Sequence, residues 1–132
     1  AKNQQPVRIL ILQSKENLEK AKICSPCTFN SPCVLIFCTD TNICFNSADG
    51  TRTSADIDAT LVGSQVMLAC AEQGLGSCFV LLFDANKTKE LFNLPENIKP
   101  IFYMPIGYPA EDAIVNVRHN QRYSIDEITK IL

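Results

Sequence analysis

Residues 57–83 read IDATLVGSQVMLACAEQGLGSCFVLLF, and this segment decides the fold of the chain. The part up to Ala71 is apolar with only small or polar interruptions, which predicts a long helix. Gly74 is the expected C-terminal cap, because glycine adopts the left-handed conformation without strain. The unbroken apolar run Ser77–Phe83 then predicts a central strand. Within the longer stretch Asp56–Pro109, the expected order is therefore helix, turn, strand, helix and strand.

The helix expected over Ile57–Ala71 carries apolar side chains around most of its circumference. Ser54 or Asp56 is its expected N-cap. Gly63 in its interior costs about 1 kcal/mol relative to alanine, which indicates a close approach by another segment at that point. A helix that is apolar on nearly every side must be covered by its own domain or by a partner subunit.

Shorter segments flank this stretch. The run PVRILILQ predicts a strand buried on both faces, CVLIFC predicts a central strand, and IFYMPI predicts a fourth strand; these runs are Pro6–Gln13, Cys33–Cys38 and Ile101–Ile106. Short helices are expected over Lys15–Ile23 and Ala85–Asn93, with Ser14 and Asp84 as their N-caps. Strands that alternate with helices predict a layered α/β fold with a mixed or mostly parallel sheet flanked by helices.

The overall composition indicates one globular domain. The chain has 132 residues, 46% of them hydrophobic, and a formal net charge of −2. Without a basic cluster there is no field to attract nucleic acid, and without a sufficiently long apolar run we expect no membrane span. The chain starts at Ala1 and turns apolar after six residues, so we expect the single domain 1–132 to be N-terminally incomplete. Seven cysteines cannot all pair within one chain, which favours reduced thiols and a cytoplasmic protein.

A cysteine-rich loop offers one candidate for chemistry. Cys24 and Cys27 have the spacing that can give two thiolates to one metal ion, and Cys33 follows. The second pair that would complete a tetrahedral site is absent, so loop or core thiols are the favoured interpretation and a zinc or iron–sulfur site the alternative. Cys70 and Cys78 lie in the most apolar segments and are expected in the core.

The remaining polar residues do not form a recognisable catalytic set. His119 is the single histidine and lies in a polar tail, which favours a solvated surface residue over a general base. Asp56 and Asp58 stand at a helix start, where they complement the helix dipole. Gly74 and Gly76 leave a helix and enter a strand, the reverse of a dinucleotide-binding turn. A protein without its own nucleophile, acid or metal set can take its chemistry from a cofactor.

The run Met67–Phe79, MLACAEQGLGSCF, resembles the nitroreductase family of flavin-dependent oxidoreductases, which carry an LAA…LGLGSCW run leaving their central helix. The similarity continues through Phe83-Asp84, Leu94-Pro95-Glu96 and Ile106–Pro109. The first six residues, AKNQQP, are similar to the end of the family's PSAxNxQPW segment, with Val7 where an aromatic residue is usual. Arg122 ends a region similar to the family's C-terminal K/R-x-R.

The resemblance implies an FMN-dependent enzyme. Such proteins bind FMN at the interface of an intertwined homodimer and pass electrons from NAD(P)H to a small-molecule acceptor, of the nitro, quinone or flavin type, by a ping-pong mechanism. The long apolar helix would then be the buried element of the dimer. By position, Asn3 and Gln5 would address the polar edge of the flavin ring, and Arg122 would bind the phosphate. The backbone of four residues would face the ring near N5: Phe79, Val80, Leu81 and Leu82.

Two departures from the family pattern keep a second interpretation open. In the family, the R-x-S-x-R phosphate motif lies upstream of the position that corresponds to Ala1. In addition, Leu81 and Leu82 stand where small residues are common in the family. The alternative is therefore a non-catalytic nitroreductase-like module that binds a nucleotide or flavin without turnover. A small metal protein that uses the Cys24–Cys33 loop is the third interpretation.

Overall fold

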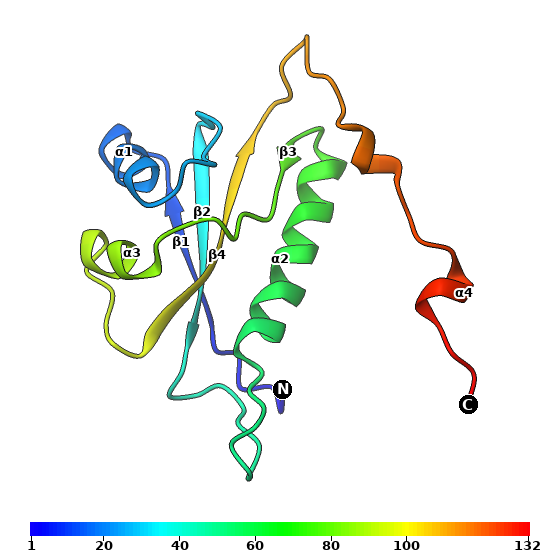
Figure 1. Cartoon of the computed structure of the whole chain (residues 1–132). Coiled ribbons are helices and arrows are strands. Elements are labelled where there is room, and N and C mark those ends of the chain that lie inside the picture. The colour runs from blue at the N-terminus through cyan, green and yellow to red at the C-terminus, as the bar shows by residue number, and fades with distance from the viewer.

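The computed structural model describes residues 1–132 and shows a four-stranded sheet with helices on both faces (Figure 1). The helix and strand bounds, in chain order, are β1 Val7–Leu12, α1 Lys15–Cys24, β2 Cys33–Asp40, α2 Ala55–Glu72, β3 Gly76–Ser77, α3 Ala85–Leu91 and β4 Ile98–Gly107, followed by a 3₁₀ turn Val117–Asn120 and α4 Ile125–Ile128. The α/β class is confirmed.

The sheet has the strand order β1-β2-β4-β3, and all three pairings are antiparallel. The expected mixed or mostly parallel sheet is therefore wrong for this chain. The register gives the reason, because Leu12 at the end of β1 lies opposite Val34 at the start of β2. The intervening segment with α1 starts and finishes at one end of the sheet. A connection between parallel strands would instead have to return the chain to the end of the sheet where β1 begins.

Two apolar clusters lie on opposite faces of the sheet. One joins α1 and α3 to alternate residues of β2 and surrounds Tyr103, and the other joins α2 to Phe37, Phe102 and Met104. The strand β2 is buried almost throughout, which confirms the prediction of a central strand over Cys33–Cys38.

The strand β1 lies at the edge of the sheet and is only partly buried. Leu12 is buried, whereas Ile9 is 39% exposed and Ile11 is 64% exposed. The expectation that Pro6–Gln13 is buried on both faces is wrong, because β1 is an edge strand and no element covers these two isoleucines. An apolar run has the same sequence signature whether one face or two are covered.

The segment expected as a central strand, Ser77–Phe83, is also different. The strand β3 consists of Gly76 and Ser77, and the chain returns to the sheet at Val80 in a single bridge with Tyr103. Leu81 and Leu82 are 74% and 65% exposed. The prediction of an unbroken buried strand is wrong because this segment forms the outer edge beside β4. Cys78 is exposed as well, which corrects its expected place in the core.

The helix α2 confirms the prediction over Ile57–Ala71 and extends it at both ends. Gly63 lies against the sheet, where a Cβ atom would come within 2.5 Å of Phe102 Cζ and 3.0 Å of the Phe79 ring. The predicted close approach is therefore present, although it involves aromatic side chains. Ser54 occupies the N-cap position but makes no capping bond, and its hydroxyl instead donates to Asp58 Oδ2 at 2.6 Å.

Other local predictions are confirmed. Ser14 accepts a hydrogen bond from the backbone N–H of Asn17, and Asp84 Oδ1 accepts from Asn86 and Lys87 at 3.0 Å each. The C-cap of α2 is Gln73, and Gly74 directly after it has φ = 72°, the left-handed conformation expected of the glycine that ends the helix.

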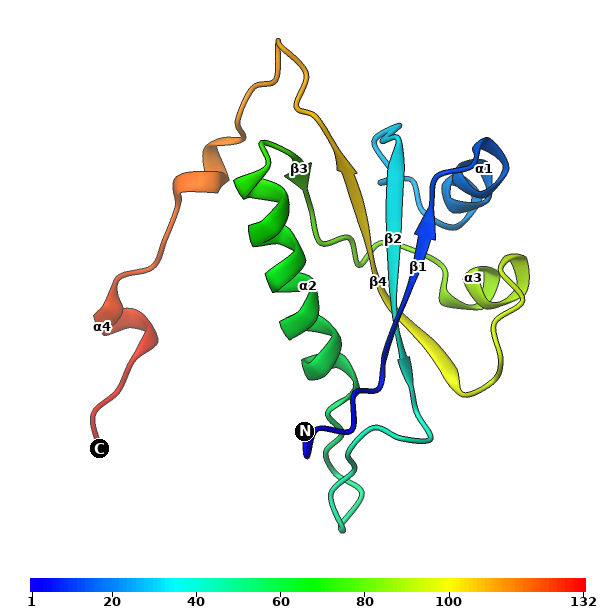
Figure 2. The same cartoon turned by 180° about the vertical axis from the view of Figure 1, so that it is seen from behind.

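The C-terminal tail from Ala110 to Leu132 is exposed at every residue and leads away from the sheet (Figures 1 and 2). Its two short helical turns lie beyond α2, and it carries large apolar side chains such as Ile114 and Tyr123 in solvent. Among the helices of the chain, not one combines the length and apolar character required to cross a bilayer.

Candidate functional site

The segment Val80–Phe83 is held firmly at the open edge of the sheet. Val80 and Tyr103 exchange backbone hydrogen bonds of 2.9 and 3.0 Å, and the Phe83 ring lies 4.9 Å from the Tyr103 ring. The hydroxyl of Ser25, a fully buried residue, donates to the Leu82 carbonyl at 2.7 Å. The main chain here is therefore anchored to β4 and to the end of α1 at the same time.

This anchored segment presents unpaired donors. The backbone N–H groups of Leu81 and Leu82 donate to no backbone or side-chain acceptor in the chain, while their side chains point into solvent. Adjacent exposed N–H groups on a rigid support can bind a hydrogen-bond acceptor of a ligand without first breaking an internal bond. Of the predicted backbone contacts at Phe79, Val80, Leu81 and Leu82, those of Val80 are not available, because its N–H and carbonyl are both bonded to Tyr103.

The two predicted N-terminal amides lie next to each other. Gln5 Nε2 donates to Asn3 Oδ1 at 3.0 Å, and both residues have positive φ values, 55° for Asn3 and 51° for Gln5. A positive φ is strained for glutamine, and such strain is found preferentially at ligand sites. Both side chains line a shallow cavity beside Asp58, Leu61 and Val62 of α2.

The predicted phosphate ligand lies elsewhere. Arg122 is in the exposed tail, where its Nη1 donates to the carbonyls of His119 and Gln121 at 2.7 Å. It lines a surface hollow formed only by tail residues, so it meets neither Asn3 nor Leu81 within one chain. His119 is itself exposed, as the sequence predicted.

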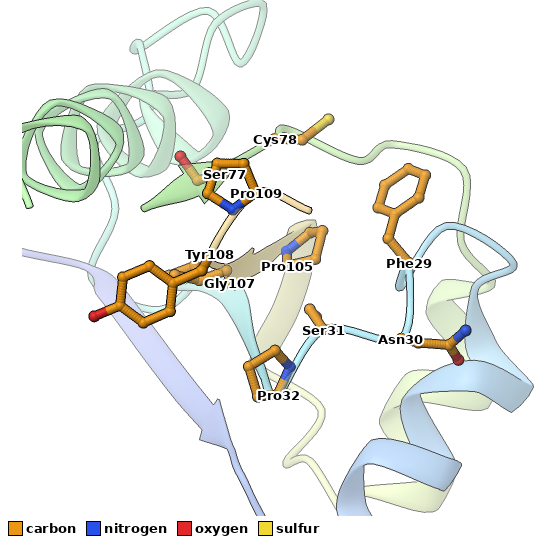
Figure 3. Close-up of a pocket in the computed structure, with 12 residues that line it drawn as sticks. Phe29, Asn30, Ser31, Pro32, Ser77, Cys78, Pro105, Gly107, Tyr108 and Pro109 are labelled. Carbon is orange, nitrogen blue, oxygen red and sulfur yellow. The ribbon is translucent and has the colours of Figure 1, made fainter. Parts of the chain in front are cut away.

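A further cavity of about 320 Å³ was not predicted from the sequence (Figure 3). It lies where β4 ends, between the loop after α1 and β3, and three prolines line it: Pro32, Pro105 and Pro109. Phe29 and Tyr108 stand at its sides, and Cys78 closes one edge (Figure 3). No lining residue is charged. The sequence held no signal for this cavity, because its lining comes from three segments that are distant along the chain, residues 29–32, 76–78 and 105–109.

The cysteine-rich loop does not assemble a metal site. Nowhere in the chain do three His, Cys, Asp or Glu side chains come close enough to hold a metal ion, and Cys24 is buried in the core. Burial raises the pKa of the Cys33 thiol and raises that of Cys38 to about 12. These two thiols therefore stay protonated at neutral pH, which does not suit a thiolate ligand or nucleophile.

Three relatives have the same fold or a similar sequence. A nitroreductase family protein from Clostridium difficile superposes with a TM-score of 0.89 at 28% identity, over 98% of this chain and 75% of that one. A proposed NAD(P)H:FMN oxidoreductase from Staphylococcus epidermidis gives a TM-score of 0.82 at 21% identity, over 100% of this chain and 78% of that one, which shows the fold alone.

The third relative is an NADPH-dependent oxidoreductase of Staphylococcus aureus. It is 29% identical over 103 residues, which are 70% of this chain and 41% of the relative. The chain thus spans about two fifths of the length of the curated relatives it matches. The model of the family described as Nitroreductase family matches residues 1–108 of the 132, and the chain therefore belongs to the nitroreductase family.

Proposed function

We propose that this chain binds FMN and acts as an NAD(P)H-dependent flavin oxidoreductase that passes electrons to a small-molecule acceptor by a ping-pong mechanism. The observation that carries the proposal is the pair of unpaired N–H groups at Leu81 and Leu82 on an anchored segment. Membership of the nitroreductase family and the similarity to an NADPH-dependent oxidoreductase support it.

The donor groups of the chain fit the two ends of a flavin ring. The N–H groups of Leu81 and Leu82 match the acceptor atom N5, and the amides of Asn3 and Gln5 match the alternating donors and acceptors of the pyrimidine edge. The Asn3–Gln5 hydrogen bond holds the two amides together, so a ligand can exchange one exposed bond for several. Bound FMN supplies the two-electron chemistry, and the chain orients the ring and sets its hydrogen bonds.

We propose that the complete site forms in a homodimer. Ile57, Leu61 and Leu68 project from α2 and are between 61% and 65% exposed, so they form an uncovered apolar surface. The tail that carries Arg122 is also exposed and does not pack against the sheet of its own chain. A second copy of the chain that packs against the α2 surface and the tail would cover these exposed residues. In that assembly the Arg122 guanidinium would be placed to bind a phosphate bidentately.

The reaction itself gives the test of this function. The purified protein supplied with FMN should oxidise NADPH or NADH in the presence of a quinone or a nitro compound. Initial rates at several acceptor concentrations should give the parallel reciprocal plots of a ping-pong mechanism. Absence of oxidation while FMN is bound would instead favour the non-catalytic binding module, which the separation of Arg122 from the other predicted ligands also suggests.

All seven cysteines are free, and we propose a cytoplasmic location on that basis.

A further inference from the structure

We infer that Leu81 and Leu82 are specificity-determining residues that select neutral, planar, apolar electron acceptors of the quinone type over anionic ones. The inference rests on the proposed function, because it places these side chains beside the reacting edge of a bound flavin. It goes beyond that function by naming the residues and the physical property that choose the acceptor.

The main chain that carries these two exposed side chains is fixed in place. The main chain at Leu81 and Leu82 is anchored at Val80 by two bonds to Tyr103, and at Leu82 by the bond from Ser25. The Leu81 carbonyl also accepts from the Phe83 N–H at 3.1 Å. A core residue gains by burial, whereas these two leucines leave 74% and 65% of their surface in water. Holding large apolar groups in solvent is unfavourable for the free protein, and contact with a ligand would offset that cost.

The position of the leucines places that ligand at the reacting centre. The N–H groups that fit flavin N5 belong to the same two residues as the exposed side chains. An acceptor must come within about 3–3.5 Å of the reacting atom for transfer, so it must also contact the side chains at this position.

The segment itself carries no cation that would favour an anion, and the first cation after it, Lys87, lies 3.8 Å from the Asp84 carboxylate. No residue from Gln73 to Phe83 is charged, and the cavity that begins at Cys78 has no charged lining residue. A carboxylate held against two leucines would lose hydration without gaining a partner, which is unfavourable. A neutral quinone loses no ionic hydration and gains apolar contact.

The chemical step balances with the electron donor already proposed. NAD(P)H plus one proton plus the quinone gives NAD(P)⁺ plus the hydroquinone. The nicotinamide C–H bond breaks, two electrons reach the quinone, and its two carbonyl oxygens become hydroxyl groups with one proton from NAD(P)H and one from solvent.

The test compares the binding of two probes to oxidised, FMN-loaded protein without NAD(P)H. One probe is duroquinone, whose ring carbons are all methylated so that thiols such as Cys78 do not add to it readily, and the other is 4-nitrobenzoate. We expect Leu81→Ala/Leu82→Ala to weaken duroquinone binding about tenfold in equilibrium dialysis and to weaken 4-nitrobenzoate binding by a clearly smaller factor, because the anion gains less from apolar contact. Ile11→Ala is the matched control, since Ile11 is 64% exposed on β1, at the opposite edge of the sheet from this segment.

A charge variant sharpens the test. Leu82→Lys should strengthen 4-nitrobenzoate binding about two- to fivefold, as expected for an exposed ion pair, and should weaken duroquinone binding. The inference is overturned if the alanine variant binds both probes more weakly by the same factor or binds both as tightly as the wild-type protein. It is also overturned if the substitutions change the oligomeric state and leave probe binding unchanged. Failure of the wild-type protein to retain FMN would instead contradict the proposed function, so the two failures are distinguishable.

Discussion

At Gly63 the helix α2 and the sheet approach each other more closely than any side chain permits. A Cβ atom there would lie 2.5 Å from Phe102 Cζ, and Phe102 is itself buried and stacked on Phe37 with ring centroids 4.5 Å apart. The ring therefore has no room to move aside, and the helix would have to shift.

We predict that Gly63→Ala lowers the free energy of unfolding by about 1–3 kcal/mol, as is typical of overpacking. This loss occurs although alanine raises helix propensity by about 1 kcal/mol. Urea unfolding followed by circular dichroism measures it, with Gln65→Ala on the exposed side of α2 as the control. A more stable Gly63→Ala protein would show that the close approach is absent.

A second core contact joins Thr88 to Tyr103. Thr88 Oγ1 donates to the Asp84 carbonyl at 2.7 Å, so it accepts from the Tyr103 hydroxyl at 2.9 Å. Thr88→Val should cost about 1–3 kcal/mol in chemical denaturation, because it leaves a buried hydroxyl without a partner. Adding Tyr103→Phe should recover part of the loss. Strictly additive effects of the two substitutions would contradict the contact.

Burial raises the pKa of Tyr103 well above its usual 10.0. The folded phenol therefore keeps its proton at pH values where the unfolded one releases it. Its contribution to stability is fully present below about pH 10 and is lost as the pH rises above that value toward the folded pKa. We predict that the unfolding free energy of the wild-type protein falls more steeply above pH 10 than that of Tyr103→Phe. Parallel curves for the two proteins would show that this phenol titrates normally.

At the scale of elements, the helix α2 leaves an apolar surface uncovered. Leu61 and Leu68 lie two helical turns apart and are 62% and 65% exposed. If this surface is the dimer contact, Leu61→Glu/Leu68→Glu should give a monomer in sedimentation velocity, where the wild-type protein gives a dimer, because two carboxylates would be buried against their own copies. Ile23→Glu on α1 should stay dimeric. A monomeric wild-type protein would refute the proposed assembly.

Elements with a strong periodic or capping signal could be predicted from the sequence. The helix α2, the strand β2 and the caps at Ser14, Gly74 and Asp84 depend on local residues and were expected correctly. Strand direction and edge position depend on which elements pair in space. An apolar run therefore could not show that β1 is an edge strand or that Leu81 faces solvent.

The same limit applies to the candidate site. The resemblance named the backbone at Leu81 as a candidate, and it remains a prediction. The proximity of Asn3 and Gln5 could be expected, since the two residues are only two positions apart in sequence. The cavity in Figure 3 could not be predicted from the sequence, because the sheet brings its lining residues together from three separate turns. The place of Arg122 was also beyond reach, since it depends on the course of an exposed tail.

At the scale of the whole molecule, the predicted ligands lie in three places: the sheet edge at Leu81 and Leu82, the N-terminal amides, and the tail. Our proposal joins the first two places through a single bound flavin.

The most direct test is a titration of FMN with the purified chain, followed by the loss of flavin fluorescence. We predict saturable, stoichiometric quenching for the wild-type protein. Asn3→Ala/Gln5→Ala should bind about tenfold more weakly, the factor that about 1.4 kcal/mol of lost hydrogen bonding represents. FMN fluorescence that does not change with the wild-type protein, or equal affinity of the two proteins, would contradict the account.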